Sequence, residues 1–337
     1  MFRKLSLAAA SACMLACAAL PTGAAEIRMM TFGGATNLPV WIAQEKGFFE
    51  KEGVKLTYAQ TNGSVEQIKG FYEGKFDVIS TAFDNIVAYA EGQSDIPLPG
   101  PYDMVAFMGV HGGMNSLMTR ADINGYADIK GKTVAVDALK SGYGIVLYQI
   151  LKQRGKLTVD KDYKVISVGN TDKRLEAMRD NKAVAAIIGA PTDIEVQKQG
   201  FKLLADAAKE LGSYQGSAMV VRTSWAKDHE ADLAPFIRAV VAATDLIFKD
   251  KELSIAVLRK HIPTMTQEDA EKLYPRLVGP GGLIPHSAMD IKGVKTVLKI
   301  RETYGEPKKK MGPISRYVDT SYYKRALAQT SPAAAKK

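Results

Sequence analysis

Hydrophobic and polar positions divide the chain into two stretches in which strand-like segments alternate with helix-like segments. In the first stretch, apolar residues predict strands at 26–31, 54–58 and 76–80. Cap-forming residues predict helices that begin at Thr36 or Asn37, at Ser64, and at Thr81 or Asp84. Strands and helices that alternate at this spacing form a parallel sheet covered on both faces.

The same pattern begins again near residue 132. Strands are predicted at 132–137, 163–168 and 185–188. Helices are predicted to begin at Ser141, Thr171 and Thr192. The segments 74–79 and 181–186 echo each other, since each follows a helix and enters a strand. Two units of one kind predict an α/β protein with two lobes, each a mostly parallel sheet flanked by helices.

Two glycine-containing segments separate these units and are expected to carry the chain between the lobes. They are residues 111–115, after the apolar run 104–110, and residues 214–217, before a strand at 218–221. Glycine permits the backbone rotation that a hinge needs. Lobe one is predicted to contain 26–113 and 215–329, with helices at 234–248, 267–274 and 288–303, and lobe two to contain 114–214. Two ordinary loops within one large sheet are the alternative.

The N-terminal segment has the pattern of a secretory signal peptide. Basic Arg3 and Lys4 precede an apolar, Ala-rich run from Leu5 to Leu20, and small residues then lead to a cleavage site near Ala25. This run is short for a membrane span, which needs about 20 strongly apolar residues. The pattern therefore predicts export to the periplasm, with a retained anchor as an alternative.

Both cysteines of the chain, Cys13 and Cys17, lie inside this signal segment. Cleavage near Ala25 would leave no disulfide, thiolate nucleophile or cysteine metal site. Lipid attachment at Cys17 is a further alternative.

Composition and charge indicate whether the protein has a nucleic-acid partner. Hydrophobic residues make up 46% of the chain, which is ample for packed cores, and the formal net charge is +9. Basic residues alternate with acidic ones, as in 50–52 and 160–162, and this arrangement is typical of a solvated surface. We therefore expect no nucleic-acid partner. The Ala/Lys-rich tail 330–337 is expected to be disordered.

Candidate binding residues lie where strands end, because ligands of open parallel sheets bind beyond the C-terminal ends of strands. The loops concerned are 31–37, 60–64, 80–85, 137–144, 169–171 and 189–193. Backbone N–H groups at helix starts bind anions, and Ser64 and Ser141 are the best placed for this. Each residue alone is equally explained as a helix cap or a turn residue, so the prediction depends on six loops converging. His111 is a further candidate because it lies at the first crossing.

Catalytic motifs are missing from the sequence. It contains no Gly-x-Ser-x-Gly elbow, phosphate-binding Walker loop or zinc-binding His-Glu-x-x-His, and its four histidines are scattered. Asp77 with Asp84, or Asp137 with Asp193, could form an acid–base pair, but nothing in the sequence distinguishes them from ordinary caps and solvated groups. We therefore predict a non-enzymatic protein with no cofactor and no metal.

Four segments resemble one family of transport proteins. LPVWIAQEKGFFEKEGV at 38–54 resembles the first helix and turn of nitrate-, sulfonate-, taurine- and thiamine-precursor-binding proteins, and the likeness continues through 63–85, 129–151 and 317–327. The resemblance implies a type II periplasmic-binding-protein fold that closes on a small organic solute. It also implies delivery of that solute to an ABC permease with its ATPase. A periplasmic enzyme on the same scaffold and a ligand sensor for a membrane receptor are the alternatives.

The resemblance also implies which residues contact the ligand, since in this family the contacts come from loops after strands in both lobes. On this sequence those loops carry Gly33, Thr36, Asn37, Ser64, Thr81, Asp84, Ser141, Tyr143, Asn170 and Thr192. Acidic Asp84, Asp137 and Asp193 would favour a solute with donor groups, such as an amino or heterocyclic compound. Tyr143 or Phe83 is placed to stack on a ring. Related enzymes that make a thiamine pyrimidine have a cysteine-rich iron motif that the cleaved chain lacks. We expect a monomer.

Overall fold

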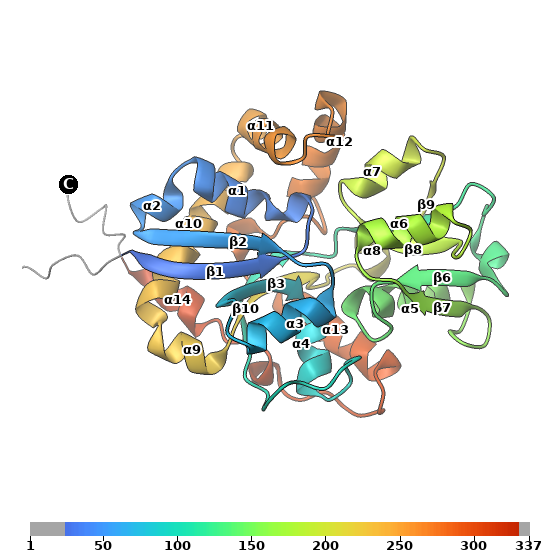
Figure 1. The fold of residues 1–337 in the computed structure, drawn as a ribbon, viewed down its shortest axis with the longest axis horizontal. Coiled ribbons are helices and arrows are strands. Elements are labelled where there is room, and N and C mark those ends of the chain that lie inside the picture. The colour runs from blue at the N-terminus through green and yellow to red at the C-terminus, as the bar shows by residue number, and fades with distance from the viewer. Residues whose placement is uncertain (1–23, 330–337) are drawn as a thin grey trace, which may run out of the picture.

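The computed structural model describes residues 24–329 and contains two five-stranded sheets, each flanked by helices (Figure 1). The predicted signal segment up to residue 23 and the predicted tail 330–337 lie outside the described residues. Within 24–329, no helix combines the length and the apolar character needed to cross a membrane. We call each sheet with its surrounding helices a lobe.

The sheet of lobe one has the strand order β2-β1-β3-β10-β4. Its strands are β1 (Ala25–Thr31), β2 (Val54–Gln60), β3 (Val78–Ala82), β4 (Val105–His111) and β10 (Ser217–Val221). β1 pairs in parallel with β2 and β3, and β10 runs antiparallel to both β3 and β4. Four strands therefore share one direction and β10 opposes them.

The sheet of lobe two repeats this arrangement with the order β7-β6-β8-β5-β9. Its strands are β5 (Asn115–Thr119), β6 (Thr133–Val136), β7 (Lys164–Ser167), β8 (Ala185–Gly189) and β9 (Lys202–Asp206). Here β5 is antiparallel to β8 and β9. In each lobe the opposed strand is the first one after the chain enters from the other sheet. The prediction of two mostly parallel sheets is confirmed, and the single reversed strand in each was not predicted.

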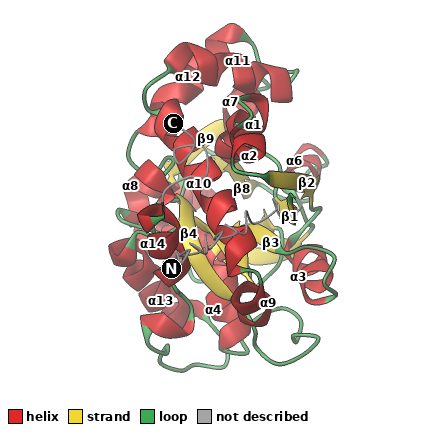
Figure 2. Ribbon diagram, turned by 90° about the vertical axis from the view of Figure 1, so that its left-hand side faces the viewer, coloured by secondary structure: helices red, strands yellow, loops and turns green. Residues whose placement is uncertain are grey.

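Helices enclose both sheets (Figure 2). Those before β5 or after β10 are α1 (Leu38–Glu45), α2 (Phe48–Lys51), α3 (Ser64–Tyr72), α4 (Phe83–Ala90), α9 (Thr223–Asp228), α10 (Glu230–Ile247), α11 (Lys251–His261), α12 (Gln267–Val278), α13 (Ile291–Tyr304) and α14 (Ser321–Ala328). Those between β5 and β10 are α5 (Gly142–Gly155), α6 (Thr171–Arg179), α7 (Thr192–Gln197) and α8 (Ala207–Leu211). Short 3₁₀ helices are η1 (Ala35–Asn37), η2 (Tyr126–Ile129), η3 (Pro285–Ser287) and η4 (Ile314–Arg316).

Both faces of the first sheet are buried, because successive side chains of a strand point to opposite faces. Ile27 and Met29 of β1 belong to the core that contains α1 and α10. Met30 belongs to a second core, which contains α3, α4 and α13 and continues into α5 of lobe two. The helices α12 and α13 contact α7 and α5, respectively, and so connect the lobes. The lobes therefore share one continuous apolar core along one side.

The chain passes between the sheets twice, through 112–114 and through 212–216. The two crossings pack against each other, since Gly216 N–H donates to the carbonyl of His111. A Cβ added at Gly216 would lie 2.4 Å from the amide nitrogen of Gly113, and Gly113 has φ +102°. Glycine is therefore required where the crossings touch. The division into moving units 26–113 with 215–329 and 114–214 stays a prediction.

Several predicted helix starts differ in their caps. Ser141 caps α5 as predicted, since its Oγ accepts the N–H of Gly144 at 3.1 Å. The predicted caps Ser64, Thr171 and Thr192 are wrong, because each is the first residue inside its helix and makes no side-chain cap bond there. Asn170, one residue earlier, caps α6. The hydroxyl of Ser64 is instead used between the lobes, as described next.

Candidate functional site

The loops at the C-terminal ends of the strands meet across the interface between the lobes. Ser64 Oγ of lobe one donates to Asp137 Oδ2 of lobe two at 2.8 Å. The N–H of Gly142 donates to Asn85 Oδ1 at 2.9 Å, and the N–H of Ala35 to the carbonyl of Ala190 at 3.2 Å. The loops that the strand pattern selected therefore lie together, with the lobes in contact.

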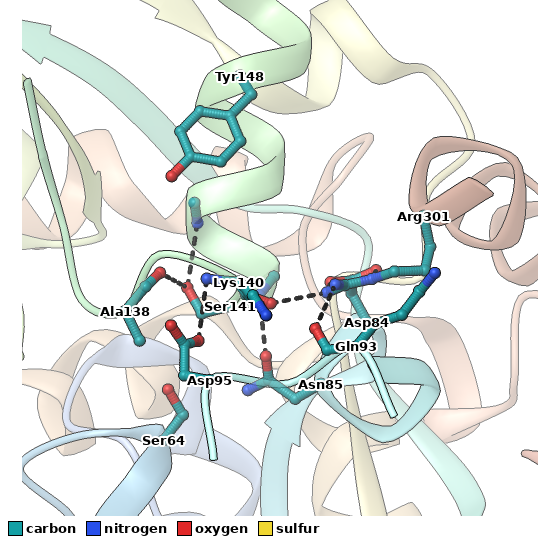
Figure 3. Close-up of polar contacts among 12 residues, drawn as sticks. Ser64, Asp84, Asn85, Gln93, Asp95, Ala138, Lys140, Ser141, Tyr148 and Arg301 are labelled. Atoms are coloured by element: carbon teal, nitrogen blue, oxygen red, sulfur yellow. Dashed lines mark hydrogen bonds and ion pairs between the residues drawn. The ribbon is translucent and has the colours of Figure 1, made fainter. Parts of the chain in front are cut away.

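Asp137 is the hub of one part of this interface. It follows β6, is buried, and also accepts the hydroxyl of Ser141. Figure 3 shows Ser141 at the start of α5 above Asn85, and Ser64 below on the side of lobe one. Ser64 and Ser141 mark the two helix starts at which anion binding is expected, and their hydroxyls both contact one carboxylate, which uses one oxygen for each lobe.

Asp84 and Arg301 form a buried ion pair next to this hub (Figure 3). Both side chains are at most 1% exposed. Arg301 Nε donates to Asp84 Oδ1 at 2.9 Å, and its Nη2 donates both to Asp84 Oδ2 and, at 2.9 Å, to the carbonyl of Lys140 in lobe two. The carboxylate of Asp84 is therefore neutralised and helps to connect the lobes.

A second ion pair crosses the interface near α7. Arg276 of α12 donates to Asp193 Oδ2 at 2.7 Å, and Ser116 donates to the same oxygen. Asp193 is 1% exposed, and its other oxygen has no hydrogen-bond partner among residues 24–329. Asp193 thus retains one buried acceptor.

A groove of about 820 Å³ lies beside this second pair. It runs between α12 with the segment 279–281 on one side and α7, β9 and α8 on the other. Its basic lining residues are Lys198, Lys209, Lys272 and Arg276. The volume is within the range of small-molecule sites, about 300–1,000 Å³.

An aromatic and cationic stack joins the lobes at a third place. The guanidinium of Arg174, in the first turns of α6, lies 5.3 Å over the ring of Tyr143, the second residue of α5. Phe32 of lobe one meets the same ring edge-on, with centroids 6.2 Å apart. Burial raises the pKa of Tyr143 and lowers that of Arg174, and in Arg174 the charge of Asp137 opposes this lowering. The phenol is therefore kept neutral while a buried cation lies on its face.

The remaining predicted residues of lobe one support the loops themselves. Asn37 donates from Nδ2 to the carbonyls of Phe32 and Gly34, while its Oδ1 accepts the hydroxyl of Thr31. Thr81 Oγ1 accepts the amide of Asn85 at 3.1 Å. Gly33 is exposed and Thr36 lies within η1.

In lobe two, Asn170 Oδ1 accepts the N–H of Lys173, and Thr192 begins α7 beside Asp193. The ligand contacts of Asn170 and Thr192 stay a prediction.

His111 lies at the first crossing, where its ring organises the backbone. Its Nδ1 accepts the N–H groups of Gly113 and Met114 at 3.0 and 3.2 Å. Complete burial lowers the pKa of His111 to about 4. A neutral imidazole therefore holds the crossing in shape.

Sequence reasoning missed four side chains of the interface: Phe32, Arg174, Arg276 and Arg301. Phe32 was inside a predicted loop but was not singled out. Arg276 and Arg301 reach the interface from C-terminal helices, far in sequence from Asp193 and Asp84, so no local pattern marks them. For Arg174, the available signal is its place one turn after the predicted helix start at Thr171, where a side chain points back toward the strand ends.

The chain is similar to known proteins both in sequence and in fold. Residues 35–253 match the family described as NMT1/THI5 like. A protein of Uromyces fabae named 4-amino-5-hydroxymethyl-2-methylpyrimidine phosphate synthase is 26% identical over 241 residues, which are 68% of this chain and 68% of that protein.

Two solved structures share the fold. One is the periplasmic nitrate-binding protein NrtA from Synechocystis, with 14% identity, a TM-score of 0.75, and coverage of 92% of this chain and 90% of that one. The other is the alkanesulfonate-binding protein SsuA from Xanthomonas axonopodis pv. citri bound to MOPS, with 15% identity, a TM-score of 0.67, and coverage of 83% and 92%. These structures confirm the type II periplasmic-binding-protein fold. The chain belongs to the NMT1/THI5-like family.

Proposed function

We propose that the protein is the extracytoplasmic solute-binding component of an ABC importer, working in the periplasm. It captures a small organic solute between its lobes by hinge closure and presents the closed form to a permease driven by an ATPase. The observation that carries this proposal is the meeting of strand-end loops from two separate sheets, with polar groups buried between them. The fold shared with nitrate- and sulfonate-binding proteins supports it.

The crossings support a hinge between the lobes. Within residues 24–329, only two segments connect the sheets, and glycines lie where these segments touch. At the strand-end loops, the lobes are joined by single polar bonds such as that from Ser64 to Asp137. Such bonds exchange readily with water, so this part of the interface can open at low cost. Opening would expose Asp137, Asp193 and Arg174 to an entering solute.

Synthesis of a pyrimidine phosphate is the second candidate function, and the name of the Uromyces fabae relative favours it. The two candidates differ in the fate of the ligand. A binding component releases its solute unchanged, whereas a synthase releases a different compound. Mass spectrometry of the ligand before and after incubation with the protein separates them.

The proposed function is tested by small-angle scattering with and without solute. We expect a solute that raises the melting temperature to reduce the radius of gyration also, because ligand binding to the closed form shifts the equilibrium toward it. Tight binding with an unchanged radius of gyration contradicts hinge closure. Recovery of a chemically altered ligand contradicts the binding role.

A further inference from the structure

Arg174 is a buried cation with spare hydrogen-bond donors. Its side chain is 3% exposed, and Nη2 donates to Thr171 Oγ1 at 2.9 Å. Its Nε and Nη1 are buried and have no hydrogen-bond partner among the residues that the structure describes. A buried, unpaired charged donor is costly, so such groups are normally paired with an anion.

The acidic groups near Arg174 are already engaged or point elsewhere. Asp137 is close enough to affect the pKa of Arg174, but its two oxygens accept the hydroxyls of Ser64 and Ser141. Asp172 is exposed, and no ion pair joins either carboxylate to Arg174 within residues 24–329. An anionic group from outside the chain can therefore act as the counter-ion of this guanidinium.

The surroundings of Arg174 add a second requirement. Its guanidinium covers one face of Tyr143, and Phe32 of the opposite lobe meets that ring edge-on. Aromatic side chains so arranged attract planar rings by stacked or edge-to-face contacts. When the lobes open, Phe32 moves with lobe one, and a planar solute can enter beside Tyr143.

We propose that Arg174 receives the anionic group of the solute while Tyr143 and Phe32 pack against a planar body, so that the captured solute is a small aromatic or heteroaromatic anion. This inference rests on the proposed function and names the class of solute. A guanidinium whose Nε and Nη1 are free can donate to a carboxylate, sulfonate or phosphate group, the anions with which arginine forms strong charge-assisted bonds.

The test measures binding of matched compounds by calorimetry and thermal shift. The probes are benzoate, benzenesulfonate and phenyl phosphate, the neutral isosteres benzamide and benzenesulfonamide, and the non-aromatic propanesulfonate. We expect at least one aromatic anion to bind and both neutral isosteres and propanesulfonate to bind at least about tenfold more weakly. A tenfold difference corresponds to about 1.4 kcal/mol, and loss of one bond to a charged group is enough to produce it.

Variants assign the effect to the residue. Arg174→Met should weaken the anion at least about tenfold and leave the neutral isosteres unchanged, whereas Arg174→Lys, which keeps the charge but loses the planar fork, should fall between them. Tyr143→Phe should retain binding, and Tyr143→Leu should lose several-fold. Arg179→Met is the matched control, since Arg179 is an exposed arginine at the other end of α6 and should bind like the wild type.

The outcomes separate the inference from the proposed function. Failure of all three aromatic anions to bind the wild-type protein overturns the inference, and so does an unchanged affinity of the Arg174→Met variant for an anion that binds. Either result leaves the proposed function intact if another solute compacts the protein. The proposed function fails separately if no solute of any class changes the radius of gyration.

Discussion

Two buried arginines of the lobe interface, Arg301 and Arg174, differ in how many of their N–H groups have a hydrogen-bond or ion-pair partner in the protein. Arg301 forms a two-bond ion pair with Asp84 and also donates to the carbonyl of Lys140. Arg174 has one hydroxyl, that of Thr171, and the face of the Tyr143 ring. Both side chains are at most 3% exposed. The same group, equally hidden, is therefore fully paired at one place and only partly paired at the other.

This difference indicates a structural role for one arginine and a solute-binding role for the other. A charge whose partners all come from the chain contributes to a fixed arrangement, and removing one partner leaves the other buried and unpaired. A charge with free donors is costly in the empty protein and gains its partner only on binding. Arg301 accordingly serves the connection between the lobes, and Arg174 serves the solute.

The largest expected effect on the free energy of unfolding comes from Arg301→Met. This variant leaves the carboxylate of Asp84 buried without its partner, and such loss costs about 3–5 kcal/mol of the free energy of unfolding. Urea unfolding followed by circular dichroism measures it. The double variant Arg301→Met with Asp84→Asn should recover much of the loss, because no charge then remains in the site. A loss below about 1 kcal/mol in the single variant would show that Arg301 is not supporting the interface.

His111 differs from the two arginines, because it is a buried titratable group that stays neutral. Its pKa is about 4 in the folded protein, against 6.5 for an ordinary histidine. As the pH falls from 6.5 toward 4, the unfolded chain gains a proton at this residue and the folded protein does not. The free energy of unfolding therefore decreases over this window, by about 3 kcal/mol at pH 4, since each pKa unit corresponds to 1.36 kcal/mol.

Chemical unfolding at pH 7, 5.5 and 4 tests the role of His111 against the variant His111→Gln, whose side chain is neutral at every pH. The difference in stability between wild type and variant should shrink as the pH falls. A constant difference across the three pH values would mean that burial at the crossing does not lower the pKa of His111.

Much of the fold could be predicted because its determinants are local. The strand–helix alternation, the cap at Ser141 and the proline in the first turn of α1 each depend on a few neighbouring residues. The strand at 218–221 was predicted and corresponds to β10, but its reversed direction and the strand β5 were not foreseen. Strand direction follows from how the chain enters each sheet, and a five-residue segment does not reveal it.

The site was predicted at the level of loops but not of side chains. The loops converge because parallel strands end at one edge of a sheet, which is a general rule. Which groups remain free at that edge depends on partners distant in sequence: Asp84 is neutralised by Arg301, 217 residues away. The sequence favours a solute with donor groups only if Asp84, Asp137 and Asp193 are free carboxylates. Of the oxygens on these three, one of Asp193 lacks a partner among residues 24–329.

The smallest expected effect on stability, and the sharpest contrast with Arg301, comes from Arg174→Met. Replacement of an unpaired buried charge by an apolar side chain of similar length removes a desolvation cost, and it also removes the contact of the cation with Tyr143, worth about 1–2 kcal/mol. These terms oppose each other, so we expect the free energy of unfolding to stay within about 1 kcal/mol of the wild type. Urea unfolding in parallel with Arg301→Met makes the measurement. A loss of 3 kcal/mol or more would place Arg174 with Arg301 as a supporting residue, because a charge held in reserve for a solute contributes little to the stability of the empty protein.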